Sequence, residues 1–308
     1  DGKKDFVREL TRKCFVNGIR IKNVQHLSKK NGRNAIVFQA RTVGRSCVTA
    51  KKVVPVLTEV LRSGYYPDDS NRRIINEEYH QYIFIQEDRF KLLSGVARMN
   101  KGKSHFNGDN FLISRLECGK AIAAIADGMG SGKRAYIESR MVIELMENCI
   151  DAGFDEKASI DLINSAYIAG GGTGNPVTMD MSVIDCQSGY MHCMKLGAVS
   201  TFIRRDKWVE IIQSTTLPMG VLEQVDYDCT TKKLYDGDYI VMVSDGVLDN
   251  IPCVNKEERM AQMIHALTIR EPSAMAEKLL EQSLAYNDMK ASDDCTVLVL
   301  GLFDTYEK

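Results

Sequence analysis

Hydrophobic residues recur at helical spacing near the start of the chain and alternate with polar residues soon afterwards. Phe6, Leu10 and Cys14 lie four residues apart, which predicts a helix, and the alternation that follows predicts strands. In order, the predicted elements are a helix over 4–17, strands over 18–28 and 34–44, a helix over 53–62 and a polar loop over 64–73. Because no catalytic constellation accompanies them, we expect residues 1–85 to form a small α/β regulatory or interaction domain.

Strand-like segments become denser from about Tyr82. Four of them follow one another with short polar turns, which predicts an antiparallel meander, at 82–86, 91–99, 110–116 and 120–127. The later predicted elements are helices over 135–150 and 156–169, strands over 177–186, 189–197, 199–205, 227–235 and 238–245, helices near 256–268 and 273–287, and a closing strand over 295–303. Runs of strands with helices inserted in pairs predict an α+β domain over 86–308, with two sheets inside and helices outside.

The first helix of this second part carries an apolar stripe. Ile137, Met141, Leu145 and Cys149 follow one another at four-residue spacing. A stripe of this kind is typical of a face that packs on a core, so we expect these four side chains to be buried.

Composition limits the class of protein. The 308 residues are 44% apolar and 26% charged, and the longest apolar run, at 295–303, is far shorter than the ~20 residues of a membrane span. The chain begins at Asp1 rather than Met. We therefore expect a cytoplasmic region cut from a longer protein, in which membrane segments could lie upstream.

The nearly neutral total charge hides a division along the chain. The first 100 residues hold 20 Lys and Arg against 10 Asp and Glu, whereas the remaining residues have a net charge of −11. No aromatic and basic interleaving accompanies the basic part, so we expect no nucleic-acid partner. The asymmetry indicates two domains, and we expect the basic part to complement the acidic second part of the chain or a protein partner.

Cysteine and histidine give no sign of a metal or disulfide framework. The nine cysteines are scattered without a CxxC pair, and the five histidines are single. We expect reduced, buried thiols. A C-x5-R spacing occurs twice, at Cys14 to Arg20 and at Cys253 to Arg259, but neither has the Gly-rich loop of a cysteine phosphatase.

Aspartates sit where predicted buried strands begin or end. Asp109 opens one strand, Asp127 and Asp245 close two others, and the pair Asp293 and Asp294 opens the last. A single Asp-Gly is usually only a turn. Four such positions in one region indicate converging carboxylates, whose repulsion a hard divalent cation such as Mg²⁺ or Mn²⁺ relieves.

The order of these motifs resembles that of a known family. GDN at 108–110, IADGMGSG at 125–132, VSDGVLDN at 243–250 and SDDCTVLVL at 292–300 are similar to the motifs of the metal-dependent PPM/PP2C serine/threonine phosphatases. The continuation GMGSGKRAYIES looks most like the stage II sporulation protein E family, a bacterial branch that acts on anti-anti-sigma factors. The resemblance covers about residues 82–305 and, much more loosely, the preceding part. It implies a PP2C-like β-sandwich flanked by helices.

The resemblance also implies a site with two Mn²⁺ or Mg²⁺ ions. Asp127 would bridge both ions and the Gly128 carbonyl would bind one, while Asp245 and Asp293 would hold the other and Asp109 would bind it directly or through water. Two such ions about 3.5–4 Å apart lower the pKa of a bridging water, and the resulting hydroxide would attack a phosphoserine without a covalent intermediate. Asp127 and Asp245 are the expected catalytic residues.

Two points of the implied site stay open. Either Asp293 or Asp294 could be the ligand. Eukaryotic members carry an early Arg that grips the phosphate, and the nearest candidates here, Lys101, Lys103 and Arg115, match no motif.

The resemblance further implies substrate and partners. The substrate would be a phosphorylated anti-anti-sigma factor in the control of sporulation. The full-length protein would carry an N-terminal membrane region, associate with the cell-division machinery at the division septum, and could form a homodimer.

Three competing functions are weaker. A P-loop would need Gly at Asp127 and Ser or Thr at Arg134, and a carboxylate in an anion-binding loop would repel phosphate. Nucleotide binding by GGGTG at 170–174 would require a helix after the loop. The segment precedes a predicted strand instead, so a flexible loop is the better interpretation. The alternative that differs most is a non-catalytic PP2C-fold binding or regulatory module, which would keep the fold without turnover.

Overall fold

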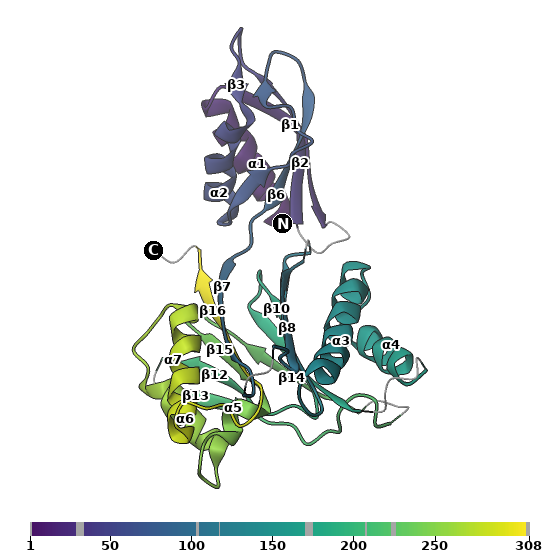
Figure 1. The fold of residues 1–308 in the computed structure, drawn as a ribbon. Helices are drawn as coiled ribbons and strands as arrows, with labels where there is room; N and C mark the ends of the chain where they lie inside the picture. The colour runs from purple at the N-terminus through teal and green to yellow at the C-terminus, as the bar shows by residue number, and fades with distance from the viewer. Residues whose placement is uncertain are drawn as a thin grey trace. The chain divides into compact units, whose positions relative to one another are not determined.

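Two sets of secondary-structure elements, each with its own hydrophobic core, make up the chain in this computed structural model (Figure 1). The structure describes residues 2–28, 34–102, 105–116, 118–169, 175–206, 208–222 and 226–305. The first unit centres on the residues up to Arg89, and the second begins at Phe90 and ends at Asp304. This division lies four residues beyond the end of the predicted 1–85 domain, whose regulatory role stays a prediction.

The first unit is a four-stranded antiparallel sheet with two helices, within the described residues. Its elements are α1 (Gly2–Val16), β1 (Ile19–Ser28), β2 (Asn34–Thr42), β3 (Val48–Thr49), η1 (Ala50–Val53), α2 (Val54–Leu61), β4 (Tyr65–Pro67), β5 (Ile74–Ile75) and β6 (His80–Gln86). The strand order is β1-β2-β6-β4, so β1 is an outer strand. Leu10 and Leu57 of the two helices share a core with Phe38 and Phe84, whose rings stack with centroids 5.4 Å apart.

Most predicted elements of the first unit are confirmed, and one loop is not. The two helices and the strands β1 and β2 lie where the hydrophobic pattern placed them. The expected polar loop at 64–73 contains β4, which pairs Tyr65 with Gln86 and Tyr66 with Ile85. Tyr65 is buried in the core, and this burial stabilises a strand that is too short to show alternation in sequence.

The second unit is a sandwich of two five-stranded antiparallel sheets among the residues described. The first sheet has the order β14-β11-β10-β9-β8, with β8 (Asp109–Arg115), β9 (Lys120–Gly128), β10 (Val177–Asp185), β11 (Tyr190–Leu196) and β14 (Asp228–Lys233). The second sheet has the order β13-β12-β15-β16-β7, with β7 (Phe90–Met99), β12 (Thr201–Arg205), β13 (Trp208–Ile212), β15 (Tyr239–Val243) and β16 (Cys295–Asp304). Ile125 and Leu298 belong to the core between the sheets.

Helices cover the outer face of each sheet, as Figure 1 shows. On the first sheet lie α3 (Lys133–Asp151) and α4 (Glu156–Ala169); on the second lie α5 (Asp245–Asp249), α6 (Lys256–Ala266), α7 (Pro272–Leu284) and the short η2 (Ala285–Asn287). The α+β sandwich with outer helices is therefore confirmed.

The predicted meander is wrong. Its four segments are divided among three sheets: β6 belongs to the first unit, β7 pairs with β16, and only β8 and β9 pair with each other. Alternation along one strand reveals which face is buried but carries no information about which strand lies beside it.

The buried face of α3 is also shifted from the predicted stripe. Ile137 is 53% exposed, whereas Val142 and Met146 are fully buried against the first sheet. This helix is apolar over a wide arc, so spacing alone did not identify the residues that face the core.

No helix within these described ranges has the length and apolar character that a bilayer crossing requires. All nine cysteines are free thiols, and five of them are buried as expected, while Cys47, Cys229 and Cys253 are exposed.

A buried ion pair ties the two sheets of the sandwich together. Lys195 of β11 places its Nζ 2.6 Å from Asp180 Oδ2 of β10, and both side chains are almost fully buried. Lys195 also donates to the Val199 carbonyl, and Thr201 of β12 in the opposite sheet donates to Asp180. The carboxylate is thus satisfied from both sheets, which makes it costly to remove one partner.

We expect Lys195→Met to destabilise the protein by about 3 kcal/mol, because it leaves the Asp180 charge buried without its cation. Urea unfolding monitored by circular dichroism measures the loss. The matched control is Lys232→Met, which breaks the half-exposed pair with Glu210 and should cost less than about 1 kcal/mol. Equal free energies of unfolding for the two variants would contradict the structural role of the buried pair.

Candidate metal centre

Asp109 and Asp127 lie side by side at one end of the first sheet. Asp109 is the first residue of β8, and its antiparallel partner across the strand pair is Asp127, next to the end of β9. Directly opposed residues of an antiparallel pair place their side chains on the same face, so two carboxylates meet here. Asp109 is fully buried, and neither of its carboxylate oxygens has a hydrogen-bond partner among the described residues.

Asp245 and Asp293 approach the same place from the second sheet. Asp245 follows β15 and is the first residue of α5. Asp293 lies two residues before β16, which begins at Cys295. Gly246 permits this approach, because a Cβ at that position would lie 2.1 Å from the Asp294 carbonyl oxygen. Any side chain there would push the start of α5, and with it Asp245, away from Asp293.

Burial and mutual repulsion raise the pKa of the three central carboxyl groups. Burial raises the pKa of Asp127 most, and the negative charges of Asp109 and Asp245 raise it further. Burial also raises the pKa of Asp109, although the hydroxyls of Ser244 and Thr296 lie near enough to oppose the shift without reaching hydrogen-bond geometry. Burial is also the main cause of the raised pKa of Asp245, and the negative charges of Asp249 and Asp293 raise it further. The site therefore carries more negative charge than its surroundings can neutralise.

Gly128 lies at the junction of β9 with the segment that leads to α3. Its amide donates to the Gly108 carbonyl at 3.3 Å, and a Cβ on Gly128 would lie 2.4 Å from the Ala135 carbonyl oxygen. Ser139 of α3 donates to the same Gly108 carbonyl. These contacts fix the start of α3 against the two strands that carry Asp109 and Asp127.

The residues present fit a hard divalent cation by their chemistry. They offer an all-oxygen donor set and a fully buried carboxylate whose two oxygens are unpartnered, which is what Mg²⁺ or Mn²⁺ would satisfy. Within the described chain, however, no three His, Cys, Asp or Glu side chains already have the spacing of a formed metal site. Side-chain adjustment would have to accompany binding, so the ligand set stays a prediction.

Asp294 is engaged by backbone groups on both of its carboxylate oxygens. Oδ1 accepts from the Lys101 amide at 2.8 Å and Oδ2 accepts from the Gly108 amide at 2.7 Å. The side chain is 3% exposed and holds the loop that leads into Asp109. Asp293 is partly exposed and has the freer carboxylate, so it is the better candidate ligand of the pair.

The predicted phosphate-binding candidates are separated by the structure. Lys101 places its Nζ 3.5 Å from Asp293 Oδ1, beside the carboxylates. Arg115 is at the opposite end of β8 from Asp109, about 20 Å away along the strand, so that candidate is wrong. Lys103, like the GGGTG segment at 170–174, lies outside the described residues.

Arg98 is a functional candidate that the sequence did not reveal. Its guanidinium donates to the Asp109 carbonyl oxygen and stacks over Phe111 at 5.5 Å from the ring centroid. Burial lowers the pKa of Arg98, and the negative charges of Asp109 and Asp294 oppose that shift. The only signal for Arg98 is its register opposite Thr296 in the β7–β16 pair, and strand pairing is not visible in sequence.

We expect the chelated protein to be destabilised by ionisation of Asp109. Its folded-state pKa, about 6, lies above the unfolded value, so this group costs no stability below the unfolded pKa, and its cost grows as the pH rises from the unfolded to the folded value. In EDTA, Asp109→Asn should therefore be more stable than the wild type by about 2 kcal/mol near pH 8 and by much less near pH 4.

Thermal unfolding at both pH values measures this difference. Asp161→Asn, at an exposed position of α4, is the control and should follow the wild type. Added Mn²⁺ should stabilise the wild type more at the higher pH. A gap between wild type and Asp109→Asn that does not change with pH would contradict the argument.

We expect Asp294→Ala to weaken Mn²⁺ binding by about tenfold or more without removing a ligand, because two buried amides lose their acceptor and the loop before Asp109 is released. Asp294→Asn, which keeps one acceptor oxygen, should lose less. Isothermal titration calorimetry with Mn²⁺ measures the affinity, and the exposed Glu277→Ala of α7 serves as control. An affinity that Asp294→Ala leaves unchanged would show that Asp294 does not position the site.

Known proteins of one family match this chain along most of its length. The sequence profile of the family described as "Stage II sporulation protein E (SpoIIE)" matches residues 118–303, more than half of the chain. The stage II sporulation protein E of Bacillus subtilis (strain 168) is 29% identical over 286 residues, which cover 92% of this chain and 34% of that protein. The stage II sporulation protein E of Priestia megaterium is 30% identical over 253 residues, which cover 82% of this chain and 43% of that protein. The chain thus spans less than half the length of these curated relatives.

Solved structures have the same fold. The PP2C phosphatase domain with a fragment of the regulatory domain of the cell fate determinant SpoIIE from Bacillus subtilis matches with a TM-score of 0.75 and 27% identity, covering 98% of this chain and 92% of that chain. RsbX in complex with magnesium is similar in fold, with a TM-score of 0.54 and 20% identity. The match covers 70% of this chain and 97% of that chain. The expected PP2C-like β-sandwich is confirmed: the second unit has the PP2C fold, and the chain belongs to the stage II sporulation protein E (SpoIIE) family.

Proposed function

We propose that the second unit is a metal-dependent protein phosphatase that hydrolyses phosphoserine. One observation carries this proposal: carboxylates from both sheets meet at one end of a PP2C-type sandwich, and the buried Asp109 among them has no hydrogen-bond partner in the described chain. A cluster of this kind is stabilised by divalent cations and otherwise costs stability.

Each residue of the site has a distinct task in this proposal. Asp127, which interacts with both Asp109 and Asp245, would hold two Mn²⁺ or Mg²⁺ ions, and the Gly128 carbonyl would bind one of them. Asp245 and Asp293 would hold the other ion, and Asp109 would bind it directly or through water. When bound, the ions would supply Lewis acidity that activates water at neutral pH and neutralises charge on the phosphoryl group. The protein's part is to keep these oxygens on a rigid frame, so that the substrate's phosphate meets a fixed arrangement of charge.

Positive side chains beside the carboxylates support phosphate binding. Lys101 lies next to Asp293, and Arg98 lies against the backbone of Asp109. A guanidinium is suited to two-point contact with a phosphate, and an ammonium group acts as a mobile point charge. Arg98 and Lys101 are therefore the residues that would orient the phosphoserine, in place of the motif residue that the sequence lacks.

Cysteine chemistry is a poor alternative. Burial raises the pKa of Cys14 and of Cys295 to about 12, so neither thiol forms the thiolate that a nucleophile requires. Cys253 is exposed, but it lacks the Gly-rich loop of a cysteine phosphatase. Direct attack by water agrees better with these environments.

The substrate and partners of the longer protein are part of the proposal. Family membership supports a phosphorylated anti-anti-sigma factor as substrate, with dephosphorylation controlling sigma-factor activity in sporulation. The region matched here is a fraction of its relatives, so anchoring of the full-length protein at the division septum, contact with the division machinery and homodimerisation are proposed for the whole protein. Residues 1–85 would then regulate the phosphatase. The alternative is a non-catalytic PP2C-fold binding module.

We expect chelation to abolish hydrolysis of a phosphoserine-containing anti-anti-sigma factor, and added Mn²⁺ or Mg²⁺ to restore it. Asp127→Asn should lower the restored rate by at least about a hundredfold, because it removes the carboxylate shared by both ions. Phosphate release after chelation and metal addition measures both effects.

Two controls separate the alternatives in this assay. Cys253→Ser should retain full activity, and a loss would reopen the cysteine mechanism. Turnover that continues in the presence of chelators would reject the two-metal proposal. Tight binding of the phosphorylated substrate without any turnover would favour the binding module.

A further inference from the structure

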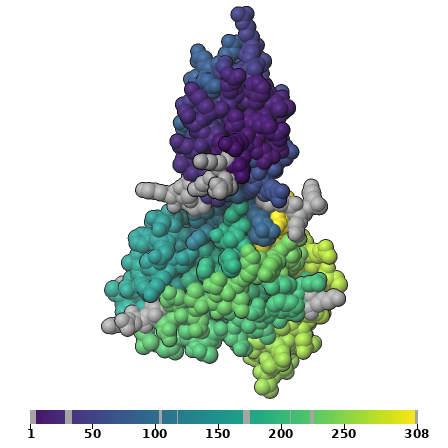
Figure 2. All heavy atoms as spheres, turned by 180° about the vertical axis from the view of Figure 1, so that it is seen from behind, coloured from purple at the N-terminus to yellow at the C-terminus, as the bar shows by residue number. Residues whose placement is uncertain are grey.

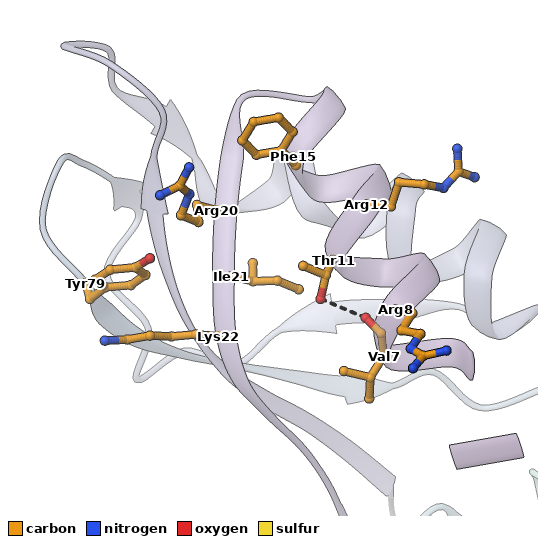
Figure 3. A pocket seen from close by; sticks show the side chains of 9 residues that line it. All are labelled: Val7, Arg8, Thr11, Arg12, Phe15, Arg20, Ile21, Lys22 and Tyr79. Atoms are coloured by element: carbon orange, nitrogen blue, oxygen red, sulfur yellow. Dashed lines mark hydrogen bonds between the residues drawn. The ribbon is translucent and has the colours of Figure 1, made fainter. Parts of the chain in front are cut away.

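A groove with a volume of about 710 Å³ lies along the outer strand β1 of the first unit, next to α1 (Figure 3). We call it the β1 groove and define it by its cationic and aromatic lining residues, Arg8, Arg12, Phe15, Arg20, Lys22 and Tyr79. In Figure 2 the purple atoms of the N-terminal segment form a continuous surface of this unit. The groove belongs to the first unit, whereas the carboxylate site belongs to the second.

The charge of the β1 groove is entirely positive. No acidic residue lines it, and none of its four cations forms a salt bridge with another residue of the described ranges. The cations are instead spaced by aromatic rings: Lys22 Nζ lies 4.0 Å from the Tyr79 centroid and the Arg20 guanidinium 5.7 Å from that of Phe15. These contacts hold the charges in place without neutralising them.

Strand geometry distributes these charges on both sides of the sheet edge. Figure 3 shows Ile21 pointing from β1 toward α1, whereas Arg20 and Lys22 point to the other face, toward Tyr79. Arg8 and Arg12 on α1 supply positive charge on the helix side. A chain lying along this edge would meet cations with the side chains of both of its faces.

The backbone of β1 is available for pairing along this edge. β1 pairs with β2 on one side and has no strand on its other side within the described chain. The register shifts between Lys22 and Gln25, where Asn23 has a φ of 54°, so a regular edge extends over Ile19–Lys22, about 13 Å. An edge strand of this kind accepts an extended segment through main-chain hydrogen bonds.

We propose that the β1 groove binds a short acidic segment of a partner protein, which adds to the sheet as an extended strand along β1. Main-chain hydrogen bonds to the edge would supply affinity, and the cations on both faces would select Asp and Glu side chains. The same cations disfavour pairing of β1 with β1 of a second copy, because like charges would then face each other across the new pair.

A protein segment agrees with the groove better than other polyanions do. A membrane surface is broad and cannot satisfy the backbone of a strand edge. Single-stranded nucleic acid depends on bases stacked on free aromatic faces, whereas Lys22 lies over Tyr79 and Arg20 lies near Phe15, the two rings of the groove. Both alternatives become outcomes of the test.

The test measures fluorescence anisotropy of a labelled peptide of about eight residues, with Asp and Glu alternating with Val and Thr, added to the full chain. The Arg20→Glu/Lys22→Glu variant should bind it at least about tenfold more weakly. The control Lys51→Glu/Lys52→Glu makes the same charge change at exposed positions of the same unit and should bind like the wild type.

A second peptide of the same sequence, with alternate backbone amides methylated, keeps the charge and removes the hydrogen-bond donors of one edge. We expect its affinity to fall at least about tenfold as well. Equal binding of both peptides would overturn strand addition. Absence of binding by the first peptide would overturn the proposal, and so would binding of phosphatidylserine vesicles or single-stranded DNA that is tighter than peptide binding and is lost in Arg20→Glu/Lys22→Glu.

Discussion

Repulsion among carboxylates held on neighbouring strands is the constraint on which the second unit depends. Asp109 and Asp127 are fixed opposite each other by the β8–β9 register, and Asp245 reaches them from the other sheet. A flexible chain would separate these charges, but strand pairing and sandwich packing prevent that separation. The fold thus stores an unfavourable interaction at one end, and a cation bound there would turn the same arrangement into a favourable one.

The surroundings of the cluster serve mainly to keep the carboxylates in position. Asp294 uses both oxygens on backbone amides and so fixes the loop before Asp109. Gly246 allows the start of α5 to approach closely, and Ser139 ties α3 to the Gly108 carbonyl. Because these contacts come from both sheets and from a helix, a displacement of any one of them would change the distances between the carboxylate oxygens of the cluster.

The first unit has a different physical character. Its core is built from its own sheet and two helices, and its basic charge is concentrated on the surface, notably around the β1 groove. The acidic charge of the chain lies mostly beyond residue 100. The proposed catalytic site and the proposed binding groove thus belong to different units, each with its own core.

The sequence by itself determined most of the elements, the sandwich class and the aspartates that gather at its end, because hydrophobic periodicity and Asp-Gly strand ends are local properties. The tertiary structure alone decided which strands are neighbours, as the divided meander shows, and which side of α3 is buried. It also distinguished Asp294, held by two amides, from Asp293, and it brought Arg98 to the Asp109 backbone. These results depend on contacts between residues far apart in the chain, which no local pattern records.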